Sequence, residues 1–340
     1  MKTPYPMTSR RRLLSGIFGG RTDRPPVGTI TSVATIEQME LTGAYFPDVH
    51  MDAEKTARLA ACAYETLGYD VIVSYFSIVP EAAALGCEID WGTIDTMPTV
   101  RTHPWADPEE VQIPPDFLEH PAIRVVLDAI RILRKKYGHE VAIVGKALGP
   151  WTLAYHVHGL EDFLIATIKE PDKVRAFLDR LKEVTVLFGI AQIQAGADLI
   201  CLGDHATGDL VGPWVYRDYL VDIHKELTQR LGCPTILHLC GNTLDRLDYI
   251  CEEGFDCFHF DSKVDAQAAV QKVAGRISLM GNINNPEILK EGTPKQVAEA
   301  TRYAMDAGVE VIGPECAVPL RTPLENLKAI AETVIKASHG

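Results

Sequence analysis

The chain has 340 residues, of which 46% are hydrophobic and 23% charged, and 46 acidic against 33 basic residues give a net charge of −13. This composition is typical of a folded globular protein with a substantial core and argues against extensive disorder. The negative charge disfavours a phosphate backbone or an anionic lipid surface as a partner, so we expect neither a nucleic acid nor a membrane partner.

The first element predicted in the chain is a surface helix, capped by Thr8 or Ser9. Arg10-Arg11-Arg12 stands before a short apolar stretch there, as in a twin-arginine signal. The apolar stretch is shorter than the ~7–15 residues of a signal and runs into further charges. We therefore predict that residues 1–25 form an N-terminal helical segment and that the protein is cytoplasmic.

Beyond this segment, short β-rich runs alternate with longer stretches of helical periodicity. Strands are predicted over 27–33, 71–75, 141–146, 199–204, 235–240, 257–261, 277–281 and 310–314. Helices are predicted over 53–67, 122–136, 172–194, 213–231, 243–253, 294–307 and 323–336. Eight strands, each followed by helical sequence, predict an α/β fold of the (β/α)8 TIM-barrel type over residues 26–340.

We expect residues 1–340 to form a single domain. An irregular insertion is predicted between the second and third strands, over 81–122, where prolines are frequent. A doubly wound open sheet is the alternative architecture, but it usually carries a glycine-rich phosphate motif after its first strand. That motif is absent here, which favours the barrel.

Polar residues follow the apolar bodies of the later predicted strands. In a barrel of this type the carboxyl ends of the strands surround the active site. We therefore expect the site at this mouth. The polar residues at these strand ends are Asp204, His205, His238, Cys240, Asn242, Asp261, Asn282, Glu315 and Cys316.

The most specific element is the pair His238 and Cys240. Residues two apart in a strand project to the same face, and Cys316 can reach the same point from the eighth strand. One histidine and two thiolates suit a tetrahedral Zn²⁺ with an open fourth position, which Asp261 could fill at rest. The remaining six cysteines, without a C-x-x-C pair, are expected to be reduced and mostly buried.

Other interpretations of these residues stay open. His205, His156, His158 and His259 are alternative ligands, although each alone fits a structural or rim histidine better than a ligand. The cysteines can be ordinary core residues. A cysteine-nucleophile enzyme needs one reactive thiol beside a histidine base. Two cysteines with one histidine fit this arrangement less well than they fit metal ligation.

Several segments spread over nearly the whole chain resemble the uroporphyrinogen decarboxylase superfamily. Within it, the resemblance is strongest to the cobamide-dependent methyltransferases, typified by methylcobamide:coenzyme M methyltransferases. The His-x-Cys…Cys set is the specific part of the resemblance. The segments are Asp-Arg-Pro-Pro-Val at 23–27, Glu-Ala-Ala-Ala-Leu-Gly-Cys-Glu-Ile at 81–89, Gly-Pro-Trp-Thr-Leu-Ala at 149–154, Ile-Leu-His-Leu-Cys-Gly-Asn at 236–242, Met-Gly-Asn-Ile at 280–283 and Pro-Leu-Arg-Thr-Pro-Leu-Glu-Asn-Leu at 319–327.

The resemblance implies zinc bound by His238, Cys240 and Cys316. It also implies methylcobamide carried by a partner corrinoid protein, with a methyl group passing from it to a thiol such as coenzyme M. Two thiolate ligands cancel the charge of zinc, so the substrate sulfur stays nucleophilic. The candidate catalytic residues are Asp261, Asp204 and Glu81, and the candidate cofactor-binding residues are Asn242 and Asn282.

One departure argues against decarboxylation. Decarboxylases of the superfamily resemble one another in an Arg-Gln-Ala-Gly-Arg stretch near the first strand, whereas residues 29–45 here contain no arginine. A substrate with many carboxylates needs such bidentate partners. Two further alternatives remain: a methyltransferase that moves methyl from an O-, N- or S-methyl donor to a corrinoid protein, and a non-catalytic corrinoid-binding barrel.

Overall fold

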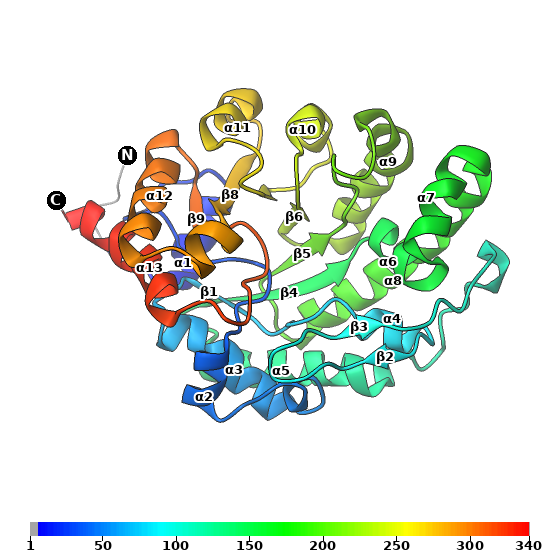
Figure 1. Ribbon diagram of the computed structural model, residues 1–340, viewed down its shortest axis with the longest axis horizontal. Helices are drawn as coiled ribbons and strands as arrows, with labels where there is room; N and C mark the ends of the chain where they lie inside the picture. The colour runs from blue at the N-terminus through cyan, green and yellow to red at the C-terminus, as the bar shows by residue number, and fades with distance from the viewer. Residues whose placement is uncertain (1–5, 340) are drawn as a thin grey trace.

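The computed structural model describes residues 6–339 and shows parallel strands surrounded by helices (Figure 1). Residues 1–5 of the predicted N-terminal segment, and residue 340, lie outside the described part. One sheet has the order β1-β4-β5-β6-β7-β8-β9, with each neighbouring pair parallel, which confirms the predicted α/β barrel fold. The strands are β1 (Val71–Val73), β4 (Ala142–Leu148), β5 (Leu199–Gly203), β6 (Thr235–Leu239), β7 (Cys257–Phe260), β8 (Ser278–Ile283) and β9 (Val311–Pro314).

The first predicted strand is wrong in its extent, because only Val27 forms a β-bridge, to Ile312. The segment still closes the barrel between β9 and β1. Gly28 N donates to Ile312 O and Ile312 N to Pro26 O, both at 2.9 Å, and Asp70 N donates to Val27 O at 2.7 Å. Gly28, directly after the bridge, has a φ of +155°, outside the β region of ordinary residues, so the ladder does not continue into 29–33.

The helices mostly form the outer layer, and their boundaries differ from the predictions mainly around 150–170. Two helices that were not predicted lie there, α6 (Pro150–His158) and α7 (Leu160–Lys169), and they meet at Gly159, which has a φ of +94°. The predicted helix over 243–253 is instead a 3-10 turn, η4 (Leu244–Arg246), followed by α10 (Leu247–Ile250). Arg246, fully buried at this turn, donates to the carbonyls of Ala206 and Val211 in the neighbouring loop. The other helices are α2 (Ile36–Thr42), η1 (Asp48–His50), α3 (Ala53–Glu65), α4 (Pro80–Ala84), α5 (Pro121–Tyr137), α8 (Pro171–Ala195), α9 (Pro213–Leu231), α11 (Ala266–Val273), the π-helix η5 (Asn285–Lys290), α12 (Pro294–Ala307) and α13 (Leu324–His339).

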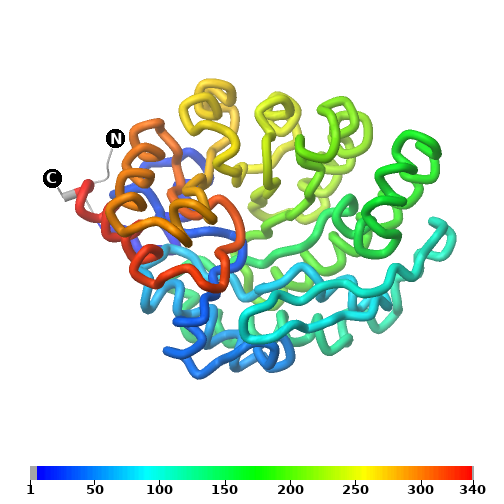
Figure 2. The backbone as a smooth tube through the Cα atoms, viewed as in Figure 1, coloured from blue at the N-terminus to red at the C-terminus, as the bar shows by residue number. Residues whose placement is uncertain are grey.

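The insertion after the second strand position is irregular, as predicted. It contains β2 (Ile89–Asp90) paired antiparallel with β3 (Thr99–Val100), and two short 3-10 turns, η2 (Pro108–Glu110) and η3 (Phe117–Glu119). Figure 2 shows this cyan segment running along the outside of the barrel toward α6 and α7. Trp105 N donates to Val157 O at 3.0 Å, which joins the insertion to α6.

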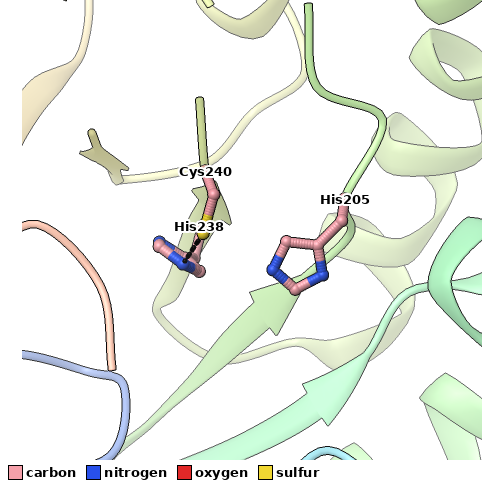
Figure 3. Close-up of side chains that lie close together, drawn as sticks. All are labelled: His205, His238 and Cys240. Atoms are coloured by element: carbon pink, nitrogen blue, oxygen red, sulfur yellow. Dashed lines mark hydrogen bonds between the residues drawn. The ribbon is translucent and has the colours of Figure 1, made fainter. Parts of the chain in front are cut away.

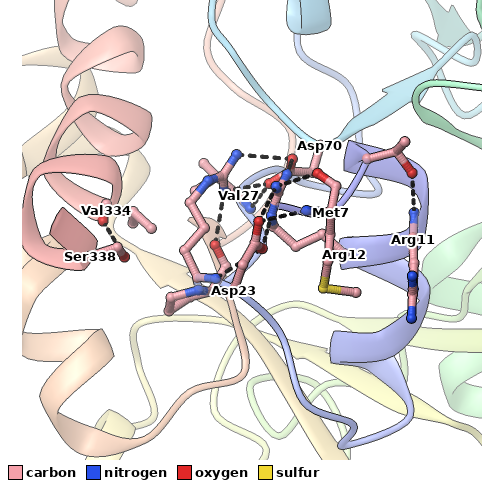
Figure 4. Close-up of polar contacts among 11 residues, drawn as sticks. Met7, Arg11, Arg12, Asp23, Val27, Asp70, Val334 and Ser338 are labelled. Carbon is pink, nitrogen blue, oxygen red and sulfur yellow. Dashed lines mark hydrogen bonds and ion pairs between the residues drawn. The ribbon is translucent and has the colours of Figure 1, made fainter. Parts of the chain in front are cut away.

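The N-terminal helix α1 (Ser9–Ile17) is confirmed, with Thr8 as its cap: the Thr8 Oγ1 accepts from Arg11 N at 3.2 Å. Its buried Arg12 binds Asp23 at 2.6 Å and Asp70 at 2.7 Å, and Arg24 binds the other Asp70 oxygen at 2.7 Å (Figure 4). Asp70 directly precedes β1, so this ion network fixes α1 to the amino-terminal end of the barrel, opposite the predicted mouth.

Among the described residues, no helix combines the length and the apolar character needed to cross a bilayer. The prediction that residues 1–340 form one domain stays a prediction.

Candidate metal centre

Three predicted ligands converge at the carboxyl end of the barrel. His238 lies in β6, Cys240 follows that strand, and Cys316 follows β9. The Nε2 of His238 lies 3.2 Å from the Cys240 Sγ and 3.4 Å from the Cys316 Sγ, and the two sulfurs are 3.0 Å apart. The sulfurs are not bonded to each other, because a disulfide is about 2.05 Å long, and both cysteines are free thiols.

The surroundings of His238 prepare its Nε2 to act as a ligand. The Nδ1 of His238 lies 3.3 Å from the carbonyl oxygen of His259, which can only accept, so we assign the ring proton to Nδ1 and the lone pair to Nε2. Burial lowers the pKa of His238 well below its ordinary value, and the neighbouring His259 and His205 lower it further. The imidazole is therefore neutral, which metal ligation requires.

The two thiols are joined by a hydrogen bond. The hydrogen bond between them raises the pKa of Cys240 well above its ordinary value, and burial adds to this rise. The same hydrogen bond lowers the pKa of Cys316. One of the two sulfurs is thus already predisposed to be a thiolate, the form that binds metal.

The donor set fits a tetrahedral zinc ion. At zinc bond lengths of about 2.3 Å to sulfur and about 2.0–2.1 Å to nitrogen, tetrahedral ligands are about 3.8 Å apart for two sulfurs and about 3.6 Å for sulfur and nitrogen. The three atoms lie 3.0–3.4 Å apart, so small outward rotations of the thiols reach these separations. One nitrogen and two sulfurs leave a fourth position open.

Of the four alternative histidines, His205 comes closest to this centre. It follows β5, and one ring nitrogen lies within 4.8 Å of the ligand atoms of His238 and Cys240. Figure 3 shows its ring turned toward these two side chains. The backbone N of His205 donates to Thr152 Oγ1 at 2.8 Å, and its Nδ1 lies 3.3 Å from the same oxygen. Thr152, in α6, therefore orients the ring.

Two of the other three histidines have structural partners. The ring of His259 packs at a tilt against that of His238, with centroids 4.6 Å apart, and its Nε2 lies 2.8 Å from Pro314 O. His158 Nδ1 lies 2.9 Å from Trp105 O. Burial lowers the pKa of His156 to about 4, so it is neutral.

Asp261 lies beside Cys240 and shapes the turn that follows it. Its Oδ2 accepts from Gly241 N at 2.8 Å and its Oδ1 from Lys263 N at 2.9 Å. Gly241 has a φ of +78°, and a Cβ there would lie 2.2 Å from Thr207 Oγ1, so only glycine fits. The carboxylate is half-buried and adjoins the centre closely enough to raise the pKa of Cys240.

Asp204 and Glu81 are buried, and both oxygens of each carboxylate are bonded within the protein. Asp204 Oδ1 accepts from the N and the Oγ1 of Thr152, at 2.8 and 3.2 Å, and its Oδ2 lies 3.1 Å from His224 Nε2. Glu81 Oε1 accepts from Leu148 N at 3.0 Å, and its Oε2 accepts from the Tyr75 hydroxyl. Through these hydrogen bonds, both carboxylates hold neighbouring groups of the protein in position.

The two candidate cofactor-binding asparagines lie toward the carboxyl end of the barrel, Asn242 in the loop after β6 and Asn282 within β8. Asn242 is exposed, and its Oδ1 accepts from Leu244 N at 3.3 Å. Asn282 is half-buried, and its Nδ2 donates to Val264 O at 2.8 Å. Neither hydrogen bond involves the three ligands.

Sequence reasoning missed three side chains near the centre. These are Lys146 in β4, Thr152 in α6 and His224 in α9. Thr152 and His224 gave no local signal, because their partners are distant in sequence. A lysine inside an otherwise apolar strand was a signal that could have drawn attention to Lys146.

The model of the uroporphyrinogen decarboxylase (URO-D) family matches residues 8–337. The chain belongs to the uroporphyrinogen decarboxylase family. This confirms the resemblance seen in the sequence.

Within the family, methyltransferases are similar over nearly the whole chain. A methylated-thiol–coenzyme M methyltransferase of Methanosarcina mazei is 36% identical over 95% of this chain and 88% of its own. The methylcobamide:CoM methyltransferase MtbA of Methanosarcina acetivorans is 33% identical over 96% of this chain and 97% of its own. A solved methyltransferase from Methanosarcina mazei superposes with a TM-score of 0.94 at 31% identity, covering 97% of this chain and 99% of its own. This member of the uroporphyrinogen decarboxylase family is a methyltransferase.

Proposed function

We propose that this methyltransferase moves a methyl group between a methylcobamide carried by a separate corrinoid protein and a small thiol such as coenzyme M. The observation that carries the proposal is the convergence of the His238 nitrogen and the Cys240 and Cys316 sulfurs within 3.4 Å at the carboxyl end of the barrel. The names of the relatives, which include methylcobamide and coenzyme M, support the choice of the two substrates.

His238, Cys240 and Cys316 would hold Zn²⁺, which when bound lowers the pKa of an acceptor thiol to below neutrality. The neutral imidazole and two thiolates cancel the charge of the ion, so the acceptor sulfur keeps its electron density. We propose that Asp261, beside Cys240, occupies the fourth position of the site before the acceptor enters.

The transfer balances without a further reactant. The acceptor loses its S–H proton to solvent, an S–CH₃ bond forms and the Co–C bond breaks. The electron pair of the Co–C bond stays on cobalt, which is reduced from Co(III) to Co(I). The corrinoid protein must therefore bind at the mouth of the barrel, where we propose that Asn242 and Asn282 contact the corrinoid. The chain would act in the cytoplasm, where its cysteines stay reduced.

The loop beside the centre disfavours decarboxylation of a porphyrinogen. The arginine-free segment 29–45 borders the loop that carries Cys316: Val318 N donates to Ser32 O at 2.9 Å, and Ile36 N donates to Leu320 O at 2.8 Å. A tetrapyrrole with many carboxylates would find no guanidinium on this segment.

A second candidate function is transfer in the opposite direction, from a methylated thiol to Co(I). One observation favours it: the methyltransferase at 36% identity is named for methylated thiols as well as for coenzyme M. The same donor set serves both directions, because a thioether sulfur can occupy the position of a thiol.

A spectroscopic assay of methylcobalamin demethylation tests both directions. Zinc-loaded protein is mixed without oxygen with methylcob(III)alamin and coenzyme M, and in a parallel series with cob(I)alamin and dimethyl sulfide. We expect conversion that depends on protein and zinc, and in the first series also on the thiol, and no CO₂ from uroporphyrinogen. Absence of transfer in both series would contradict the proposal.

A further inference from the structure

A lysine side chain inside the barrel takes no part in the chemistry described so far. Lys146 belongs to the fully buried strand β4 and is 4% exposed. Its side chain points into the barrel: a Cβ added to Gly203 of β5 would lie 3.9 Å from Lys146 Cε, and Nζ lies 4.7 Å from the centre of the Tyr75 ring. The preceding Gly145 faces outward instead, toward Gln192 of α8.

The strand register places Lys146 one inward-facing layer beneath the metal centre. Lys146 pairs with Cys201, and His238 pairs with Gly203, two residues further along β5. Gly203 has no side chain, which leaves the lysine room to extend toward the mouth.

The ammonium of Lys146 has no anionic partner among the described residues. No carboxylate oxygen there forms an ion pair with Nζ, which lies over the Tyr75 ring. Glu81 is near enough for an electrostatic interaction, but its carboxylate is bonded to Leu148 N and to the Tyr75 hydroxyl. A buried cation is costly without a partner, so this position is suited to an anion from outside.

We propose that Lys146 binds the acid group of the acceptor and so selects thiols that carry a negative charge a short chain away from the sulfur. This inference rests on the proposed function, which places the acceptor sulfur at the metal centre one layer above. A sulfonate and a carboxylate both accept charge-assisted hydrogen bonds from an ammonium. A neutral thiol leaves Lys146 unpaired and therefore binds more weakly.

Binding of anions without a thiol group tests the site independently of methyl transfer. Sodium ethanesulfonate, sodium propionate and the neutral ethyl methyl sulfone are titrated calorimetrically into the zinc-loaded protein. We expect at least one anion to bind tenfold or more tightly than the sulfone and to compete with the thiol. Which of the two anions binds more tightly shows whether the acceptor carries a sulfonate or a carboxylate. Equal binding of all three compounds overturns the inference.

Two variants test whether Lys146 is the residue responsible. Lys146→Met keeps the length and removes the charge, and Lys146→Gln is a second version in case the first fails to fold. We expect the affinity for the preferred anion to fall at least tenfold in these variants. The ratio of kcat/KM for coenzyme M to kcat/KM for 2-mercaptoethanol should also fall at least tenfold, because KM for coenzyme M rises. Lys182→Met is the matched control, since Lys182 pairs with Asp179 and Glu226 on the outer helices. An unchanged ratio in a folded Lys146 variant overturns the assignment.

The outcomes separate this inference from the proposed function. If the wild-type protein binds an anion through Lys146 but methylates no thiol, the anion site stands and the proposed function fails. If thiols are methylated at rates that do not depend on their charge, the proposed function stands and the anion site is overturned.

Discussion

The Nε2 of His224 lies 3.1 Å from the Oδ2 of Asp204, and neither side chain has exposed surface. The other ring nitrogen of His224 lies 3.0 Å from Glu253 Oε2. Burial alone lowers the pKa of His224, but the carboxylates of Glu253 and Asp204 outweigh it and raise the pKa to about 9. Asp204 in turn accepts from Thr152, which orients His205 at the metal centre. A buried ion group in the barrel wall thus supports the site.

This group predicts a pH-dependent stability. The folded pKa of His224, about 9, exceeds the unfolded value of about 6.5, so its contribution is fully present below pH 6.5 and is lost as the pH rises through 9. The quantity compared is the difference in the free energy of unfolding between the wild type and His224→Gln. We expect this difference to favour the wild type by on the order of 3 kcal/mol more at pH 6 than it does at pH 9.5. Denaturant unfolding of both proteins across this range measures it. A difference that is constant with pH would show that the histidine is neutral.

We predict that the sulfur of Cys316 is required for zinc binding. Cys316→Ala leaves one imidazole and one thiolate, so we expect zinc to fall well below one ion per chain and methyl transfer to fall at least a hundredfold. Metal analysis of dialysed protein gives the first number. Cys233→Ala removes a half-buried free thiol far from the centre and should keep both properties. Full zinc occupancy in Cys316→Ala would remove this residue from the ligand set.

The carboxylate of Asp261 holds the turn after Cys240 and is the proposed resting partner of the metal. Removing it in Asp261→Ala should weaken zinc binding by about 10- to 100-fold, the range seen when groups that support ligands are lost. Competition with a chromogenic chelator measures the affinity. Asp248→Ala removes an exposed carboxylate that pairs with Lys272 and Arg276, and we expect no change. Equal affinities in the two variants would leave Asp261 without this role.

At the opposite end of the barrel, Arg12 links α1 to Asp23 and Asp70 (Figure 4). Arg12→Met leaves the buried carboxylate of Asp70 and the half-buried one of Asp23 short of a partner, so we expect a loss of about 3 kcal/mol in the free energy of unfolding. Arg11→Met, on the exposed face of the same helix, should change it by less than about 0.5 kcal/mol. Zinc content below the unfolding transition should be unchanged in both variants. A loss of zinc in folded Arg12→Met would mean that the two ends of the barrel are coupled.

The convergence of the three ligands was predictable because it follows from local rules. The period of two along β6 puts His238 and Cys240 on one face, and the barrel brings the end of β9 to the same mouth. The extent of the first strand was not predictable from its β-rich composition, because the bridge at Val27 depends on Ile312, which is far along the chain.

The roles of the interior charges could not be predicted either. Asp204 ends a predicted strand exactly as a site residue should, but its partners His224 and Thr152 come from two helices whose packing the sequence does not specify. Glu81 is likewise held by Tyr75 and by the backbone of β4. A polar residue at a strand end can therefore belong to the site or to its support, and only the packed structure separates the two.

The number of sulfur atoms bound to zinc tests the central claim most directly. X-ray absorption at the zinc edge is recorded on the purified protein, first alone and then with coenzyme M. We predict two sulfurs at about 2.3 Å without the thiol, from Cys240 and Cys316, and three with it. A zinc shell without sulfur, or one that the thiol leaves unchanged, would contradict the account.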